Sequence, residues 1–174
     1  ALAGGGEAFA SDNDPDLIRD ASPFSLKMME SLLSESPRHR GLLLAAAKGF
    51  TQYAYAYVQQ NAEEIETTDV TLAYAQRDRA KRLYLRARDY GLRGLPLEHP
   101  ELPVQLRADP QAAVKGINPE DAALLYWTGA AWAAAIASGK DDPFLVADLP
   151  IVEALIMRAY EIDEALDYGA LHVF

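Results

Sequence analysis

The stretch Gly41-Leu-Leu-Leu-Ala-Ala-Ala-Lys-Gly-Phe-Thr-Gln-Tyr-Ala-Tyr-Ala-Tyr-Val-Gln-Gln60 decides the fold class of this chain. Small residues alternate here with aromatic ones, and Phe50, Tyr53, Ala54 and Tyr57 follow the i, i+3, i+4, i+7 spacing of one helix face. Small residues let neighbouring helices approach closely, while rings fill the gaps between them. The stretch therefore predicts a long helix packed against other helices, with tyrosine hydroxyls that need polar partners.

Proline marks the expected starts of the other helices. Six of the ten prolines follow a residue whose side chain can cap a helix, and proline at the first helical position lacks the N–H that would otherwise have no partner. The pairs are Asp14-Pro15, Ser22-Pro23, Ser36-Pro37, Asp109-Pro110, Asn118-Pro119 and Asp142-Pro143. No run shows sustained strand alternation, and only Leu102–Leu106 has a pattern compatible with an extended segment. The sequence therefore predicts an all-α fold.

The same signals give a coarse map of the chain. We expect a flexible leader over residues 1–13 and a single helical domain over residues 14–174. The expected helices span 15–35, 37–62, 69–94, 109–115, 118–138 and 143–163, with a last one from 167. The segment 94–108 carries three prolines and is expected to be the longest loop. Pro150 should divide the 143–163 segment, with Asp148 capping its second part.

Fragments of a tetratricopeptide (TPR) pattern appear within these helices. Ala80, Tyr84 and Ala87 match the small–aromatic–small spacing of a second repeat helix, and residues 43–50 approach the pattern of a first one. The spacing between matching positions is irregular, whereas a regular array repeats every ~34 residues. We therefore expect antiparallel helical hairpins stacked as a degenerate TPR-like array.

Composition and motifs argue against several classes of function. A net charge of −10 disfavours nucleic acid as a partner, and the lack of cysteine excludes disulfides and thiolate chemistry. No apolar run approaches the ~20 residues of a membrane span. The three histidines have no metal-ligand spacing, and neither a phosphate-binding loop nor a nucleophile elbow is present. We predict a protein that is not an enzyme, with no catalytic residues, no metal and no cofactor.

One candidate interaction surface is basic. Residues 77–93 hold seven of the sixteen positive charges, and a helix would place four arginines on one face: Arg79, Arg82, Arg86 and Arg93. This face could dock an acidic partner. Alternatively, the arginines pair within the chain, since Asp78 precedes Arg82 by four residues and Asp89 precedes Arg93 by four.

Four segments resemble one known family. They are Gly49-Phe-Thr-Gln-Tyr-Ala-Tyr-Ala-Tyr57, Arg82-Leu-Tyr-Leu-Arg-Ala-Arg-Asp-Tyr-Gly91 and Leu125-Tyr-Trp-Thr-Gly-Ala-Ala-Trp132, with Ala147-Asp-Leu-Pro-Ile-Val-Glu-Ala-Leu155 as a fourth. Together they resemble the T-component (TatT) family of tripartite ATP-independent periplasmic (TRAP) transporters, from about Asp14 to Phe174.

The resemblance implies a periplasmic, usually lipid-anchored helical protein that binds the solute-binding (P) subunit of the transporter and forms homotrimers around a pore or cleft. The anchor of such proteins is absent from this chain, and the family continues into further helices, so we expect the chain to be truncated at its C-terminus.

The aromatic motifs of the family also suggest where a ligand binds. They map here to Phe50, Gln52, Tyr53, Tyr57, Tyr126, Trp127 and Trp132. We predict that these residues line a cleft or pore for an apolar or amphipathic ligand, although the same rings and alanines also suit a plain helical core. A generic peptide-binding helical-repeat scaffold is the alternative function.

Overall fold

The computed structural model describes residues 13–163 and 166. Within them every regular element is a helix, which confirms the all-α prediction. The first helix, α2 (Pro15–Glu35), begins as expected, because the Asp14 side chain accepts a hydrogen bond from the Leu17 amide at 3.0 Å. After a short turn, α3 (Arg40–Tyr53) continues without a break into the π-helix η1 (Ala54–Gln59) and into α4 (Gln60–Ile65).

The chain then reverses into the longest helix, α5 (Val70–Gly94). A series of short elements follows: the 3₁₀ turn η2 (Leu95–Leu97), α6 (Leu102–Ala108), α7 (Pro110–Val114) and the 3₁₀ turn η3 (Pro119–Asp121). The buried helix α8 (Ala122–Ser138) comes next, and α9 (Pro143–Val146) and α10 (Leu149–Ile162) complete the described part of the fold.

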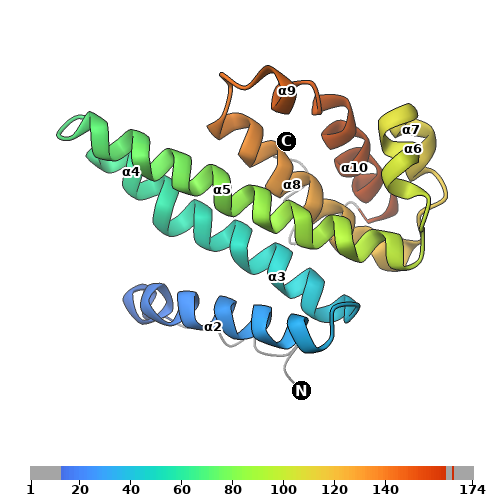
Figure 1. The fold of residues 1–174 in the computed structure, drawn as a ribbon, viewed down its shortest axis with the longest axis horizontal. Coiled ribbons are helices and arrows are strands. Elements are labelled where there is room, and N and C mark those ends of the chain that lie inside the picture. The colour runs from blue at the N-terminus through green and yellow to red at the C-terminus, as the bar shows by residue number, and fades with distance from the viewer. Residues whose placement is uncertain (1–12, 164–165, 167–174) are drawn as a thin grey trace.

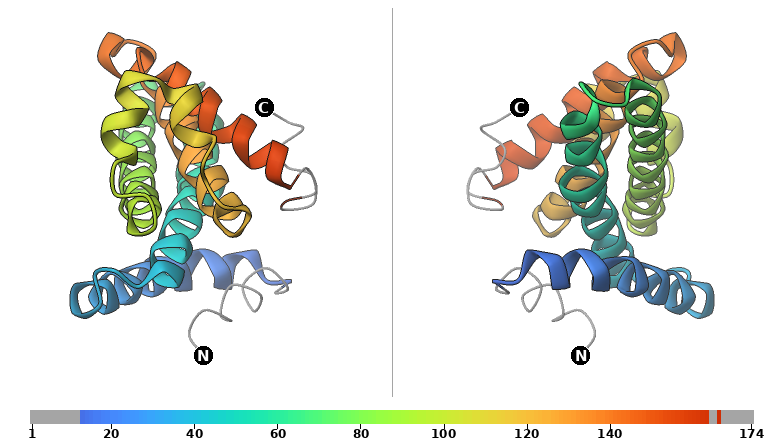
Figure 2. Two further views of the ribbon diagram at one scale, coloured as in Figure 1. Left: turned by 90° about the vertical axis from the view of Figure 1, so that its right-hand side faces the viewer. Right: turned by 90° about the vertical axis from the view of Figure 1, so that its left-hand side faces the viewer.

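Successive helices lie side by side and run in alternating directions. Figure 1 shows the α3–η1–α4 rod antiparallel to α5, with α8 packed on α5 and α10 on α8. Figure 2 shows α2 crossing beneath this bundle, where it packs mainly on α3. A TPR-like order of the hairpins stays a prediction.

Small residues bring the central helices together. Twelve of the residues of α8 are buried, so this helix is enclosed on nearly all sides. A Cβ atom at Gly91 of α5 would lie only 2.0 Å from the Thr128 Oγ1 of α8, and one at Gly129 would lie 2.7 Å from Ile156 of α10. At these two positions only a residue without a side chain lets the helix backbones approach so closely.

Two of the proline pairs do not begin helices. Pro23 lies inside α2 at an exposed position, and the helix continues through it although proline donates no backbone hydrogen bond. Ser36 ends α2 instead of opening the next helix, and α3 begins three residues after Pro37, at Arg40. There the His39 Nδ1 accepts from the Leu42 amide at 3.1 Å and caps the helix.

The expectation for residues 94–108 was wrong. This segment contains η2 and α6, and Leu102–Leu106 is helical, not extended. Leu102 and Leu106 are both buried, so one face of a short amphipathic helix packs on the core, and Pro103 lies within its first turn.

The other helix boundaries are close to those expected. Asp109 and Asp142 cap their helices through side-chain oxygens, and the 143–163 segment divides as predicted, although the Asp148 side chain makes no capping bond.

Within the described residues, no helix is both long and apolar enough to cross a bilayer. The expected helix from residue 167 and most of the expected leader lie outside the described part of the chain.

Candidate functional site

The four arginines of the predicted docking face lie along α5 but have different surroundings. Arg82 pairs with Asp78 on the same helix, and Arg79 donates to the Tyr53 hydroxyl at 3.4 Å. Both guanidinium groups lie on the solvent side of the helix. Arg86 and Arg93 instead point toward α2 and the turn that follows it.

A single carboxylate joins α2 to α5. Glu30 Oε1 forms an ion pair with Arg86 Nε at 2.5 Å and accepts from the Tyr90 hydroxyl at 2.5 Å, while Glu30 Oε2 accepts from Lys27 Nζ at 2.6 Å. Its side chain is only 10% exposed. Near this junction Arg93 donates to the Pro37 carbonyl at 3.2 Å. Arg86 and Arg93 therefore hold the fold together, whereas the expected pairing of Arg93 with Asp89 is replaced by a contact between Asp89 and Arg88.

The surroundings of Glu30 also set its protonation. Burial would raise the pKa of the Glu30 carboxyl, but hydrogen bonds from Lys27 and Tyr90 and the charge of Arg86 outweigh burial, so the pKa lies below its ordinary value. The pKa of Tyr90 is raised, chiefly by burial and then by the hydrogen bond that its hydroxyl donates to Glu30. Near neutral pH the junction thus holds a carboxylate and a neutral phenol.

Part of the predicted aromatic set lies at this junction. Phe50 is buried and stacks on Tyr90 with ring centres 5.8 Å apart, and the Arg86 Cζ lies 5.0 Å from the centre of the Phe50 ring. Tyr53 and Tyr57, further along the same rod, are half-buried neighbours whose ring centres are 5.7 Å apart. The Tyr57 hydroxyl donates to the Pro15 carbonyl at 3.3 Å. Two tyrosines thus reach the surface while Phe50 does not.

The other members of the set are divided between core and solvent. Tyr126, Trp127 and Trp132 are buried in α8, and Gln52 is exposed. Two cations cover the tryptophans: the Lys48 Nζ lies 5.0 Å from the Trp127 ring centre, and the Arg88 Cζ lies 5.0 Å from that of Trp132. The structure thus brings Tyr53 and Tyr57 together with Arg79 at the surface, while the rings of α8 are buried. The role of all seven residues in ligand binding stays a prediction.

The π-helix η1 contains Tyr57 and directly follows Tyr53. A π-helix has i→i+5 hydrogen bonds and more residues per turn than an α-helix, so side chains after it point in other directions than a continuous α-helix would give. Such turns often occur at functional sites. The Tyr84 hydroxyl of α5 donates to Gln59 Oε1 at 2.6 Å, and burial is the main cause of the raised pKa of Tyr84. This bond gives one tyrosine hydroxyl of the bundle interior the polar partner that the sequence requires.

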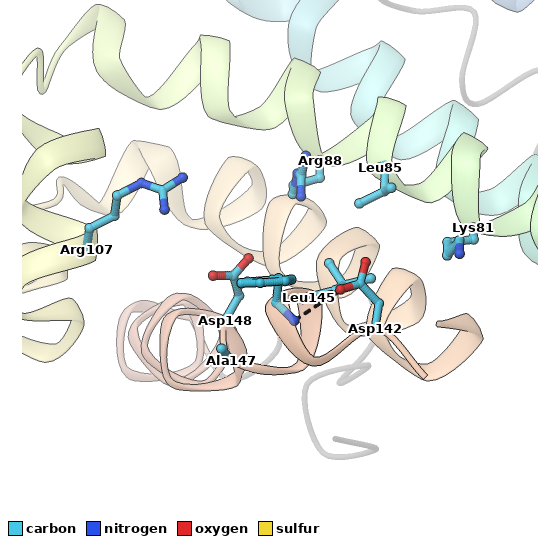
Figure 3. Close-up of a pocket in the computed structure, with 9 residues that line it drawn as sticks. Lys81, Leu85, Arg88, Arg107, Asp142, Leu145, Ala147 and Asp148 are labelled. Carbon is cyan, nitrogen blue, oxygen red and sulfur yellow. Dashed lines mark hydrogen bonds between the residues drawn. The ribbon is translucent and has the colours of Figure 1, made fainter. Parts of the chain in front are cut away.

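Sequence reasoning missed a cleft on the opposite side of α5. It has a volume of about 520 Å³ and lies between α5, α6 and the turn around α9 (Figure 3). Its lining residues are Lys81, Leu85, Arg88, Arg107, Asp142, Phe144, Leu145, Ala147 and Asp148. The spacing of Lys81, Leu85 and Arg88 could have indicated one shared face of α5, but nothing in the sequence indicated that α6 and α9 lie opposite it.

A third polar group lies at the start of α8. Arg40 pairs with Oδ1 of the buried Asp121, and the His99 Nε2 lies 3.4 Å from Asp121 Oδ2. The group joins the first turn of α3 to the segment before α6. In the described part of the chain no three histidine, aspartate or glutamate side chains are arranged to hold a metal ion.

Comparisons with known proteins agree with the resemblance seen in the sequence. An uncharacterized protein of Treponema pallidum (strain Nichols) is 32% identical over 133 residues, which cover 74% of this chain and 41% of that relative. The chain thus spans less than half of the length of the relative that it matches. The family model described as TRAP transporter T-component matches residues 11–174. Because this match covers nearly the whole chain, the protein belongs to the TRAP transporter T-component family.

Proposed function

We propose that this protein is a periplasmic accessory component that binds the solute-binding (P) subunit of a TRAP transporter. The family match over residues 11–174 is the observation that carries the proposal, since the family consists of transport accessory proteins and not of enzymes.

The solvent side of α5 is the surface that we propose for docking the P subunit. Arg82 is 64% exposed at its side chain, and its ion pair is with Asp78 of the same helix. Arg79 is exposed beside the half-buried Tyr53, its Cζ 6.0 Å from the ring centre. Arginine beside tyrosine is a common pair in protein interfaces, because each supplies large contact area with a polar end.

The four arginines contribute unequally to this surface. Arg86 is tied to Glu30, and Arg93 donates to the Pro37 carbonyl, so a partner would have to compete with these contacts. Arg79 and Arg82 would form the centre of the docking surface, and Arg86 and Arg93 its rim. An acidic patch on the P subunit is the matching chemistry.

We also propose that an apolar or amphipathic ligand binds against the predicted aromatic residues. Gln52, Tyr53 and Tyr57 would contact it directly, because they reach the surface of the rod. The buried members, Phe50 and the rings of α8, would form the layer behind them. A homotrimer, as implied by the family, would place three such rods around one pore.

The test is light scattering after size exclusion, with the protein alone and mixed with the P subunit of a TRAP transporter. We expect a co-eluting complex, three copies of each, whose affinity falls as salt rises. The double variant Arg79→Glu/Arg82→Glu should weaken the complex at least tenfold. A matched control, Lys115→Glu/Lys140→Glu, makes the same charge change at exposed positions outside α5 and should bind as the parent does.

The outcomes separate the two parts of the proposal. A stable complex that both double variants form equally well would refute the α5 surface and keep the partner. Failure of the parent protein to bind the P subunit at any salt concentration would refute the proposed function and favour a peptide-binding scaffold.

A further inference from the structure

The outer face of α2 carries a stripe of exposed apolar side chains. Leu17, Phe24 and Met28 are 57%, 70% and 45% exposed, and their spacing places them on one side of the helix. Leu26 and Leu33, which pack toward α3, lie on the opposite side. Figures 1 and 2 show the other helices on that inner side of α2, so no other described helix covers the stripe.

The spacing of the stripe is that of a coiled-coil seam. Its members follow the alternating steps of four and three residues that separate positions d and a of a heptad: Leu17, Ala21, Phe24 and Met28. Such a seam is buried when a second helix packs along it. We propose that this second helix is α2 of another copy, so that two molecules associate through an antiparallel pair of α2 helices. The inference goes beyond the proposed function, because no residue proposed to dock the P subunit or to contact a ligand lies on α2.

The side chains of the stripe complement one another in size when the two helices run antiparallel. A pair centred between residues 22 and 23 places Leu17 opposite Met28 of the second copy. The same pair places Ala21 opposite Phe24 of the second copy, so the largest ring faces the smallest side chain. A parallel pair would instead put two Phe24 rings in one layer and two Ala21 methyl groups in another, which packs unevenly.

The charges beside the stripe match in the same arrangement. Asp20 and Lys27 both flank it on one side, at the g positions of successive heptads. In the antiparallel pair Asp20 of each copy would therefore face Lys27 of the other, which gives two ion pairs related by a two-fold axis. Both side chains are mostly exposed, Asp20 at 74% and Lys27 at 68%. Lys27 has three donors, so it can keep its bond to Glu30 while it contacts Asp20 of the second copy.

The charge of α2 favours a protein partner over a lipid surface. The helix carries four carboxylates and two cationic side chains, whereas helices that lie on membranes are rich in lysine and arginine. The contact is also small: three large apolar side chains from each copy supply less than the ~1,600 Å² of a standard interface. We therefore expect a weak and reversible pair, with a dissociation constant on the order of 100 µM.

Sedimentation velocity of the protein alone tests the pair. Between micromolar and about millimolar protein, we expect the mass of the parent to approach twice that of Phe24→Asp, which places a charge in the seam. Phe144→Asp is the matched control, because it makes the same change at a ring that is 86% exposed on α9, and it should associate as the parent does. Both replaced rings are exposed, so the melting temperatures of the two variants should stay close to that of the parent.

Two further variants test the orientation of the helices. Asp20→Lys would face Lys27 of the second copy and should weaken association several-fold, and added salt should reduce the difference. Asp141→Lys makes the same charge change at an exposed position before α9 and should have no effect. Because the chain has no cysteine, Glu35→Cys can carry a single spin label. At 1.5 Å per residue the two labels should lie ~38 Å apart in the antiparallel pair, and within about 20 Å in a parallel one.

Several results would overturn the proposal. A mass that does not rise with concentration would do so, and so would equal association of Phe24→Asp and the parent. A parent mass three times that of Phe24→Asp would indicate a three-fold contact instead of a pair. Binding of the parent, but not of Phe24→Asp, to phosphatidylcholine vesicles without self-association would show that the stripe binds lipid. None of these results bears on the proposed function, because the P subunit takes no part in the experiment.

Discussion

Two regions of this molecule are joined to their neighbours by different kinds of contact. The helices α5, α8 and α10 meet through small residues, with Gly91 against Thr128 and Gly129 against Ile156. The helix α2 instead crosses the bundle: Leu26 and Leu33 pack it on α3, and the Glu30 carboxylate joins it to α5. Its outer face leaves Leu17, Phe24 and Met28 exposed, whereas α8 is buried on nearly all sides.

The difference teaches where the fold is rigid and where it can respond. Close contacts between backbones tolerate almost no added volume, because dense interiors do not deform smoothly. A junction made of charge-assisted hydrogen bonds depends on pH and salt, since its partners can instead be solvated by water. We therefore expect the α5–α8–α10 core to unfold only globally and α2 to detach at lower free energy.

The largest effect is expected from adding volume in the core. A Cβ atom at Gly91 would lie 2.0 Å from Thr128 Oγ1, which itself donates to the Leu124 carbonyl at 2.5 Å. Gly91→Val should therefore lower the free energy of unfolding by about 3 kcal/mol, as overpacking does. Urea denaturation measures this value. Gly116→Ala is the matched control, because a Cβ there meets nothing within 4 Å, and equal losses in both variants would contradict the close-packing argument.

The second effect concerns the α2 junction. Glu30→Gln removes the charge that holds Arg86 and Lys27 and should cost about 2 kcal/mol. Hydrogen exchange should speed up across α2 and stay unchanged in α8. The control is Glu35→Gln, which removes an exposed carboxylate near the end of the same helix. Faster exchange in α8 as well would mean that α2 is an inseparable part of the core.

The third effect is the pH dependence of the same contact. Because the pKa of Glu30 is lowered in the folded protein, its contribution is fully present above the ordinary value of 4.5 and is lost as the pH falls through the folded pKa. The difference in stability between the parent and Glu30→Gln should therefore shrink as the pH falls below about 4.5. Melting curves from pH 3 to pH 7 measure it, and a difference that stays constant would assign the stability to packing.

The smallest effect is local to the first turn of α2. Asp14→Ala removes the bond that Asp14 accepts from the Leu17 amide and should cost about 1 kcal/mol. Exchange at residues 15–18 should rise without a change at the Glu30 junction. Asp109→Ala, which removes the same kind of cap from α7, serves as the comparison. A loss at Asp14 as large as that at Glu30 would show that α2 is held mainly by its N-terminus.

Sequence patterns predicted local structure well wherever the signal lies within one or two turns. Asp14, Asp109 and Asp142 cap helices as expected, because a cap and its amides are three residues apart at most. The same reasoning failed at Ser22-Pro23 and Ser36-Pro37. The helix α2 continues through the exposed Pro23, and a serine–proline pair alone does not distinguish a proline inside a helix from one at its start.

The candidate surfaces show the same limit. Periodicity placed Arg79, Arg82, Arg86 and Arg93 on one helix, but only the structure showed that Glu30 of α2 engages Arg86. The alternative of pairing within the chain was confirmed for Asp78 and Arg82 and was wrong for Asp89 and Arg93. The cleft beside Arg88 was not foreseen, because its walls come from three elements that are distant in the sequence.

The sequence by itself determined the all-α class, most helix boundaries and, through long aromatic and small-residue motifs, the T-component family. The fold class, the helix boundaries and the family depend on short-range periodicity, capping residues and the order of motifs, which are all local properties of the sequence. Only the tertiary structure decided which arginines face solvent, which aromatic rings are buried and where a cleft opens. Those properties depend on how helices distant in the sequence pack, and packing follows from the volumes and charges of all the neighbours together.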